Sequence, residues 1–373
     1  MDYSKIRHRL HELAEPSGAE KMTKSFILET LQEYTPSQIH TFENSNNILA
    51  VYDFGEGGST ILIRGDFDAV CVPETLELTY ASKTSGVSHK CGHDGHTAIL
   101  LGLAEQLHTN HLSKGRVLLF FQAAEETGEG AGQLLESGIL DRYCPQWVYA
   151  LHNIPGEPLG EVICKPESFT CSVISCDIEL HGKTSHAAEP QKALSPYPAA
   201  KTITDTLLEL NQYDMQRSDF QLVTLVEFRI GEQAYGVTAG HGVLRFTLRA
   251  KNDEVLQHTR QIVCQEVEKA IAQFPGLESN IQWKEYFAAS SNHPEAVEHL
   301  QSAAQQCQLP YIEKEFPFSW GEDFGLLTQH YPGALFGLGA GEEQPPLHHQ
   351  HFNFPDALIE KGIDLFFEIV KKC

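Results

Sequence analysis

The chain has 373 residues, of which 41% are hydrophobic and 21% are charged, and this composition is typical of a globular protein. It carries 50 Asp and Glu residues against 27 Lys and Arg residues, so the formal net charge is −23, which argues against nucleic acid or an anionic membrane as the main partner. The length exceeds what one hydrophobic core usually spans, and two domains are therefore expected.

Strand-like and helix-like segments alternate in the first part of the chain. The strand-like segments are 47–52, 59–64, 116–122 and 147–151, and the stretch 97–107 is apolar and helical in character. Strands that alternate with helices predict an α/β layer with a largely parallel sheet.

Near Phe169 the pattern changes. An alternating strand at 172–180 is followed by a helix at 196–210, strands at 221–230 and 243–250, and a helix at 253–274. This order is typical of a small α+β sandwich. Helices at 295–307 and 355–371, with a strand at 334–338, then predict a return to the first layer.

The predicted fold class is α/β: a catalytic domain with a mostly parallel sheet, into which a small α+β lid or dimerisation domain is inserted. The predicted boundaries give a discontinuous catalytic domain at 1–168 and 279–373 and an insertion at 169–278.

Two carboxylates, Asp66 and Asp68, follow the strand that ends near Arg64, and they share one face. A carboxylate in this position could hold a metal-ligating histidine in the required tautomer.

The densest group of candidate metal ligands is the segment 89–97, His-Lys-Cys-Gly-His-Asp-Gly-His-Thr, directly before the apolar helix. Cys91 and His93 are one residue apart, so in extended backbone their side chains share a face, where a thiolate and an imidazole could bind one ion or bridge two. A buried cysteine beside a helix-capping Asp94 is the structural alternative. A cysteine nucleophile with a histidine base is another, but it needs no carboxylate pair.

Glu125 and Glu126 form a carboxylate pair. They follow a predicted strand, at the sheet edge where α/β proteins place their active sites. One could ligate a metal while its neighbour acts as general base. Taken alone, the pair could also be a solvated acidic turn. However, the next strand ends at His152, and the loop 347–351 carries His348, so four distant segments together supply a ligand set for two ions.

These segments together resemble the M20 metallopeptidase superfamily. Within it they are similar to the amidohydrolase branch that includes hippurate hydrolases, N-acyl-amino-acid hydrolases and plant indoleacetyl-amino-acid hydrolases. The resemblance covers nearly the whole chain and rests on the segments 64–70, 91–96, 125–126, 151–152, 182–190, 321–324, 348 and 352–362.

The resemblance implies a site with two divalent ions, which could be zinc, manganese, nickel or cobalt. It places Cys91 in the bridging position, and the other ligands that it implies are His93, Glu126, His152 and His348. It assigns the general base to Glu125 and a supporting role to Asp68.

The resemblance also implies two residues outside the metal site. His186 matches a histidine that stabilises the oxyanion, in dimeric relatives from the partner subunit, and Arg249 matches an arginine suited to a substrate carboxylate. A homodimer or higher homo-oligomer is therefore expected. The chain departs from the family pattern at Gly236, where relatives carry a substrate-contacting asparagine, and so the pocket could differ.

The predicted activity is hydrolysis of the amide between a small acyl group, such as acetyl or benzoyl, and an amino acid. A dipeptidase or carboxypeptidase of the same superfamily and a non-catalytic metal-binding homologue are the alternatives. The segment 337–341 is rich in glycine but lacks the GxGxxG spacing of a nicotinamide site.

The sequence predicts a cytoplasmic protein that is neither secreted nor inserted in a membrane. The N-terminal residues are polar, and no run of about 18 apolar residues occurs. The nine cysteines are an odd number with no CxxC pair, which favours a reducing compartment over a disulfide framework.

Overall fold

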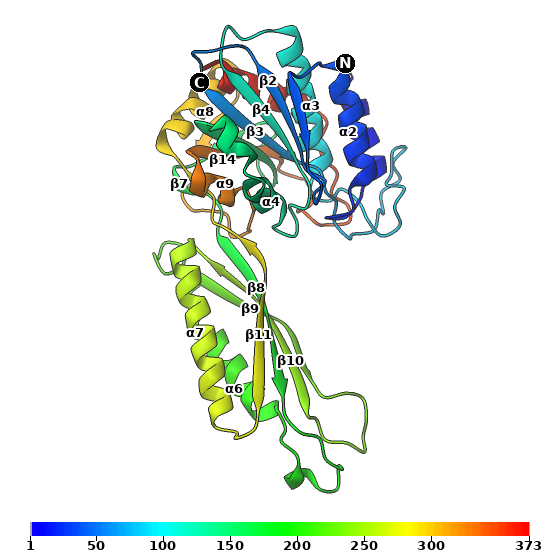
Figure 1. Ribbon diagram of the computed structural model, residues 1–373, viewed down its shortest axis with the longest axis vertical. Helices are drawn as coiled ribbons and strands as arrows, with labels where there is room; N and C mark the ends of the chain where they lie inside the picture. The colour runs from blue at the N-terminus through cyan, green and yellow to red at the C-terminus, as the bar shows by residue number, and fades with distance from the viewer. Residues whose placement is uncertain (1, 373) are drawn as a thin grey trace. The chain divides into compact units, whose positions relative to one another are not determined.

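The computed structural model describes residues 2–372 and divides into two compact units (Figure 1). The first unit contains the chain up to Phe169, the segment Ser290–Glu315 and the chain from Glu322 onward. The second unit contains Thr170–Ala289 and the short segment Phe316–Gly321. The predicted fold class is confirmed, since the first unit has a mainly parallel sheet and the second is a separate α+β unit.

The first unit is built on an eight-stranded sheet in the order β1-β2-β4-β3-β5-β14-β6-β13. Its strands are β1 Gln38–Thr41, β2 Ile48–Asp53, β3 Thr60–Asp66, β4 Arg116–Gln122, β5 Trp147–Pro155, β6 Val162–Cys164, β13 Tyr311–Glu313 and β14 Gly333–Gly341. The central strands β4, β3, β5 and β14 are parallel to one another. They are continuous apolar runs buried on both faces, as expected of a parallel sheet covered by helices.

The helices of the first unit are α1 Tyr3–Leu13, α2 Lys21–Glu33, α3 His93–Thr109, α4 Gly130–Glu136, α5 Ile139–Tyr143, α8 Pro294–Gln306, α9 Gly325–His330 and α10 Ala357–Lys372. Helix α3 is apolar on nearly every side, because it packs on the sheet and also against α1 and α10. Two short strands, β7 Glu167–Ser168 and β12 Ser291–Asn292, pair with each other.

The second unit has an antiparallel sheet in the order β11-β8-β10-β9, with two helices on one face (Figure 1). Its elements are β8 Ser172–His181, the short 3₁₀ helix Pro190–Lys192, α6 Tyr197–Leu208, β9 Gln221–Ile230, β10 His241–Ala250, α7 Asp253–Ala272 and β11 Glu278–Phe287. Even-numbered side chains of β8 and β10, such as Ile178 and Leu244, form the core with α6 and α7. Odd-numbered side chains therefore point to the opposite face.

The predicted boundary of the inserted domain at residue 278 is too early. Strand β11 begins there and pairs with β8, so the sheet continues to Phe287 and the unit to Ala289. The reason is that β11 is an outer strand with alternating polar residues, and its sequence resembles a connecting segment more than a core strand.

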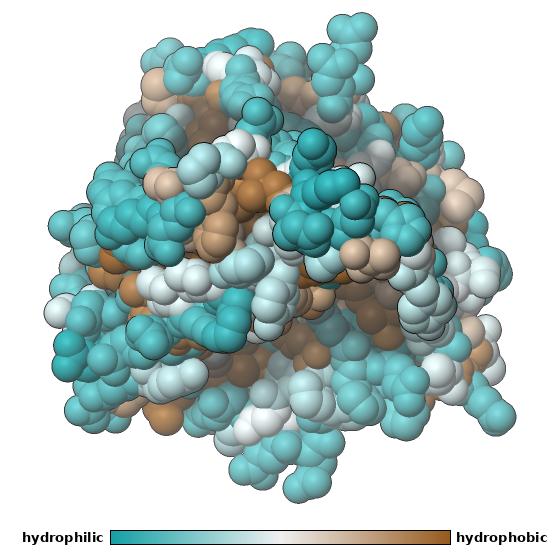
Figure 2. Space-filling view, turned by 90° about the horizontal axis from the view of Figure 1, so that it is seen from below, coloured by the Kyte–Doolittle hydropathy of each residue, from teal (hydrophilic) through white to brown (hydrophobic). Residues whose placement is uncertain are grey.

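Figure 2 shows one face of the molecule, on which hydrophilic residues predominate and hydrophobic ones are scattered. Of the helices formed by residues 2–372, none is both long enough and apolar enough to span a membrane.

A buried network of charged side chains joins α1 to the start of α3. His11 Nδ1 lies 2.8 Å from Asp94 Oδ2, and His11 Nε2 lies 2.7 Å from Glu74 Oε2. Arg7 also contacts Asp94, and Lys90 donates to Glu74. Burial lowers the pKa of His11, but the hydrogen bonds to the two carboxylates outweigh it and raise the pKa. Burial likewise raises the pKa of Glu74, but His11 and Lys90 outweigh it and bring the pKa to about 2.

We expect Glu74 to contribute stability that depends on pH. Its pKa is lower in the folded chain than the ordinary value of 4.5, so its contribution is complete above pH 4.5 and is lost as pH falls toward about 2. Chemical denaturation of the wild type and of Glu74→Gln in chelator, over this pH range, should show a difference in unfolding free energy that shrinks toward acid pH. A difference that stays constant would mean that Glu74 acts through packing alone.

Candidate metal centre

Asp66 and several of the predicted site residues gather at the carboxyl edge of the parallel strands. Asp66 ends β3, Glu125 and Glu126 follow the end of β4, and His152 lies in β5. The parallel register of β3 and β5 pairs Arg64 with Ala150, which brings the ends of these strands to the same level. This is the edge at which open α/β sheets bind ligands.

Cys91 and His152 are adjacent and buried, with 3.5 Å between Sγ and Nε2. The other ring nitrogen of His152, Nδ1, donates to the carbonyl oxygen of Asn153 at 2.9 Å. Nε2 therefore carries no proton in the neutral ring and presents a lone pair toward the thiol, which is the form that binds a metal ion.

His93 is oriented by Asp68. Its Nδ1 lies 3.0 Å from the Asp68 carbonyl oxygen and 3.1 Å from Asp68 Oδ1. Its Nε2 faces three carboxylates, at 3.7 Å from Asp66, 3.9 Å from Glu125 and 3.8 Å from Glu126. This nitrogen is buried and has no hydrogen-bond partner. A buried polar atom without a partner is costly, and a bound metal ion would satisfy it here.

His348 reaches the same cluster from the C-terminal part of the first unit. Its Nε2 lies 3.2 Å from Glu126 Oε1, and its backbone nitrogen donates to the Lys90 carbonyl oxygen at 2.7 Å. The backbone of His348 is left-handed, with φ of 63°, and its side chain is half exposed. His348 is therefore the most accessible of the candidate ligands.

Two groups of ligand atoms share the thiol of Cys91. One group joins Cys91 to His93 and His152, the other joins it to Glu126 and His348, and within each group the atoms lie within 4.8 Å of one another. Two such groups with a common sulfur fit a pair of divalent ions bridged by one thiolate. These five residues therefore fit the two divalent ions that the sequence predicts.

The local backbone around Gly92 differs from the sequence expectation. Cys91 and His93 do not share a face through extended backbone, because His93 is the first residue of α3 and Gly92 has φ of 103°. A Cβ at Gly92 would lie 2.3 Å from Asn153 Oδ1, so only glycine fits this turn. Asp94 is not a helix cap but part of the network with Arg7 and His11.

His96 and Asp66 support the centre, and His96 had no assigned role in the sequence-based prediction. His96 Nδ1 donates to Asp66 Oδ1 at 2.6 Å, and its Nε2 accepts the backbone N–H of Asn153 at 3.2 Å. Both ring nitrogens are thus used within the protein. Arg64 holds Asp66 from the other side, with Nη1 at 2.5 Å from Oδ2, and also contacts Glu322 and Asp323.

The electrostatics of the cluster favour a cation. Burial raises the pKa of Glu125, and the nearby carboxylates of Glu322 and Glu126 raise it further, well above its usual range. Burial lowers the pKa of His93, but Asp66 and Asp68 outweigh it, so the pKa is about 10. So many buried carboxylates repel one another, and divalent ions would relieve this repulsion.

Three side chains hold the backbone around Glu125 in place. Asn47 Oδ1 accepts the N–H of Ala123 at 2.8 Å, Glu20 Oε1 accepts that of Ala124 at 2.9 Å, and Asp68 Oδ2 accepts that of Glu126 at 3.0 Å. Ala124 has φ of 53°, a left-handed conformation that costs an alanine about 1 kcal/mol. The three acceptors stabilise this strained turn, which orients Glu125.

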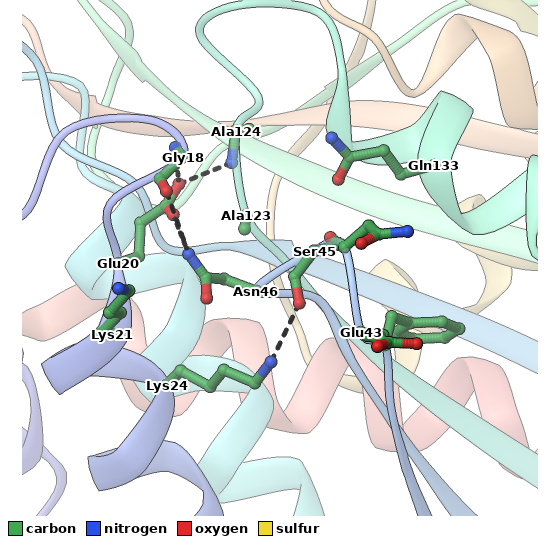
Figure 3. Close-up of a pocket in the computed structure, with 12 residues that line it drawn as sticks. Gly18, Glu20, Lys21, Lys24, Glu43, Ser45, Asn46, Ala123, Ala124 and Gln133 are labelled. Carbon is green, nitrogen blue, oxygen red and sulfur yellow. Dashed lines mark hydrogen bonds between the residues drawn. The ribbon is translucent and has the colours of Figure 1, made fainter.

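Figure 3 shows Glu20 and Ala124 joined by a hydrogen bond at the wall of a surface pocket. Glu20 is buried and also accepts from Asn46 at 2.8 Å. None of the predicted metal ligands lines this pocket. Sequence reasoning missed Glu20 and Asn47, since their partners are backbone groups far along the chain and no motif marks such pairs.

The two remaining predicted site residues lie in the second unit. His186 is exposed on the loop after β8, and its Nδ1 accepts the N–H of Ala188 at 3.1 Å. Arg249 lies near the end of β10 and donates to the Ser319 carbonyl oxygen at 3.0 Å. All five predicted metal ligands belong to the first unit.

Comparisons with known proteins agree with this geometry. The model of peptidase family M20/M25/M40 matches residues 62–372. An N-acetyldiaminopimelate deacetylase of Lactobacillus acidophilus is 30% identical over 366 residues, covering 96% of this chain and 94% of the relative. An N-acetyl-L-cysteine deacetylase of Bacillus subtilis is 31% identical over 370 residues, covering 98% and 87%. A Bacillus subtilis crystal structure described as a dinuclear metal binding peptidase from the M20 family superposes with a TM-score of 0.83 at 25% identity, covering 99% of this chain and 96% of that chain.

Proposed function

Because the chain belongs to peptidase family M20/M25/M40, we propose that it is a dinuclear metal-dependent amidohydrolase that cleaves N-acyl amino acids into a carboxylic acid and an amino acid. The observation that carries this proposal is the pair of ligand groups sharing Cys91, with Glu125 beside them. The predictions of family membership and of a hydrolase that acts on a linear amide are confirmed by the comparisons.

We assign the ions to Cys91, His93, Glu126, His152 and His348. One thiolate, three imidazoles and one carboxylate suit zinc, manganese, nickel or cobalt. When bound, the ions would lower the pKa of a water molecule and polarise the acyl carbonyl group. Asp68 positions the site, because the same carboxylate contacts both His93 Nδ1 and the backbone N–H of Glu126.

Glu125 is the proposed general base. Glu126 Oε1 lies 3.2 Å from His348, whereas Glu125 forms a candidate group with His93 and Glu126 that does not include Cys91. Its carboxylate would accept a proton from the attacking water and then donate it to the nitrogen of the leaving amino acid. The turn held by Asn47 and Glu20 fixes the backbone from which this side chain extends.

His186 and Arg249 would act at the two ends of the substrate, on the carbonyl oxygen and on the carboxylate. Within the second unit they lie at opposite ends of β10. His186 forms a β-bridge with Val237, in the loop before the first residue of the strand, whereas Arg249 is the last residue but one of the strand. Eight residues of strand span about 26 Å. In an acyl amino acid the two groups are separated by only one nitrogen and one carbon atom. We therefore propose that His186 comes from the partner subunit of a homodimer.

We expect His186→Ala to lower kcat on the order of 100-fold, the usual effect of losing one oxyanion donor, with KM altered less and metal content unchanged. Mixing inactive His186→Ala with inactive Glu125→Gln under subunit exchange should restore activity at one site per heterodimer. Steady-state kinetics on the purified heterodimer measures this. No recovery would mean that His186 acts within its own subunit or has no catalytic role.

The proposed function is tested by a substrate panel of acetyl, benzoyl and longer acyl amino acids, assayed beside dipeptides after reconstitution with each of the four metals. Higher kcat/KM for acyl amino acids supports the proposal. A preference for dipeptides would indicate a dipeptidase or carboxypeptidase, and no turnover by fully metal-loaded protein would indicate a non-catalytic homologue. We also propose a cytoplasmic location. The cysteines from Cys71 to Cys307 are all free thiols, which suits a reducing compartment.

A further inference from the structure

Two loops of the second unit pair with each other beyond the end of the sheet. The loop 182–194 follows β8, and the loop 231–240 joins β9 to β10. The N–H of Thr238 donates to the Ser185 carbonyl oxygen at 2.9 Å, and the N–H of Ala187 donates to that of Gly236 at 3.0 Å. We call these loops the loop pair. It carries both His186 and Gly236.

Two histidines lie at the base of the loop pair, one in each strand that enters it. His181 is the last residue of β8 and His241 is the first residue of β10, and they are directly opposite each other in the antiparallel register. Their rings are stacked, with 5.0 Å between centroids. Glu179 lies on the same face two residues before His181, and its Oε2 is 3.4 Å from His181 Nε2.

The surroundings of this histidine pair are those of a cation site. One ligand atom each from Glu179, His181 and His241 lie within 4.8 Å of one another. On the other side of β8, Glu278 is directly opposite His181 and adds a second negative charge to the same face. The neighbouring strand β9 carries a basic residue, Arg229, opposite Val243 of β10. Arg229 forms an ion pair with Glu227 of its own strand.

The ligand atoms lie near the separation that a metal ion requires. Zinc bound at about 2.0–2.1 Å from two imidazole nitrogens holds them roughly 3.4 Å apart. One atom each from Glu179, His181 and His241 lie within 4.8 Å of one another, and the side chains of His181 and Glu179, which are 48% and 38% exposed, have room to rotate. The face lacks a covering helix in this unit, since α6 and α7 pack on the opposite face.

We propose that Glu179, His181 and His241 form a zinc-type transition-metal site in addition to the dinuclear centre. The site binds one ion through two imidazoles and one carboxylate and leaves a coordination position for water. Glu179 and His181 precede loop 182–194, and His241 follows loop 231–240. The ion therefore joins the bases of both loops. It thereby restricts the motion of the segment that holds His186.

The test counts zinc ions per chain by equilibrium dialysis of the full-length protein against Zn²⁺, at a concentration that saturates the dinuclear centre. Wild type should bind one ion more than either His181→Asn or His241→Asn. The affinity of each variant for this additional ion should fall by at least 10- to 100-fold, the loss that removing even a supporting residue causes. The matched control is His258→Asn, an exposed histidine of α7 in the same unit, which should bind as wild type.

Hydrogen–deuterium exchange in the same samples tests the effect on the loop pair. Zn²⁺ should slow exchange at amides of 182–194 and 231–240 in wild type and in His258→Asn, but not in the two site variants. Equal zinc content in wild type, His181→Asn and His241→Asn would overturn the site. An additional ion that leaves exchange of the loop pair unchanged would overturn its bracing role. Neither result bears on Glu125 or on the activity of the dinuclear centre.

Discussion

Replacing Glu125 by Gln is expected to abolish turnover while metal content remains near that of the wild type. The amide has the same shape as the carboxylate, and the backbone N–H groups held by Asn47, Glu20 and Asp68 are unaffected. However, an amide cannot accept the proton of the attacking water at neutral pH. Loss of a general base lowers the rate by roughly 100- to 10,000-fold. Steady-state kinetics with elemental analysis of the same preparation measures both quantities.

Glu126→Gln is the matched control for this variant, since it changes the neighbouring residue in the same way. Glu126 Oε1 lies 3.2 Å from His348 Nε2 and shares a candidate ligand group with Cys91, so its loss should weaken metal retention. Added metal should then restore part of the activity of Glu126→Gln but none of that of Glu125→Gln. If the two phenotypes are reversed, the base and the ligand have been assigned the wrong way round.

Cys91→Ala is expected to lose most of its metal and with it nearly all activity. The sulfur belongs to both ligand groups, so its removal deprives two ions of a ligand at once. A cysteine binds metal only as the thiolate, and here burial, reinforced by Glu126 and Glu125, raises the pKa of the thiol well above its usual value. A bound ion must therefore supply the charge that removes the proton.

The matched control for Cys91→Ala is Cys176→Ala, which removes an equally buried thiol from the core of the second unit. Elemental analysis should show near-normal metal in Cys176→Ala and little in Cys91→Ala. Thermal unfolding of Cys91→Ala should also be shifted less by added metal than that of the wild type, because a ligand that binds only the folded state stabilises it. Unchanged metal content in Cys91→Ala would exclude the bridging role.

The parts of the site that could be predicted are those with a local signature. Cys91 and His93 stand in a dense motif, and Glu126 and His152 follow strands whose apolar runs identify them, so their convergence at one sheet edge follows from α/β architecture. His348 could be proposed only because its loop is rich in histidine and resembles the family pattern. The structure brings all five together, while their roles as ligands remain predictions.

The parts that could not be predicted depend on contacts distant in sequence. Glu20 and Asn47 bind backbone N–H groups about 80 to 100 residues away, and polar residues of these types are usually solvated. His96 stands within the motif, yet both of its ring nitrogens are hydrogen-bonded within the protein, which its spacing alone does not reveal. Strand β11 was missed since alternating polar residues at a sheet edge give a weak signal.

The position of β14 constrains how the chain can fold. Among the strands formed by residues 2–372 it is the last in sequence, yet it lies between β5 and β6, which are separated by only a short connection. The parallel pairing of β14 with β5 joins residues that are 185 positions apart, such as Gly333 and Val148, so it forms against a large loop-closure entropy. During synthesis β5 must wait with an unpaired apolar edge until β14 has left the ribosome, and such edges favour aggregation. Ending the chain before β14 would separate β6 and β13 from the other strands of the sheet, because β14 lies between them and β5. His348 lies seven residues after the end of β14, so the proposed ligand set is complete only once β14 has been synthesised.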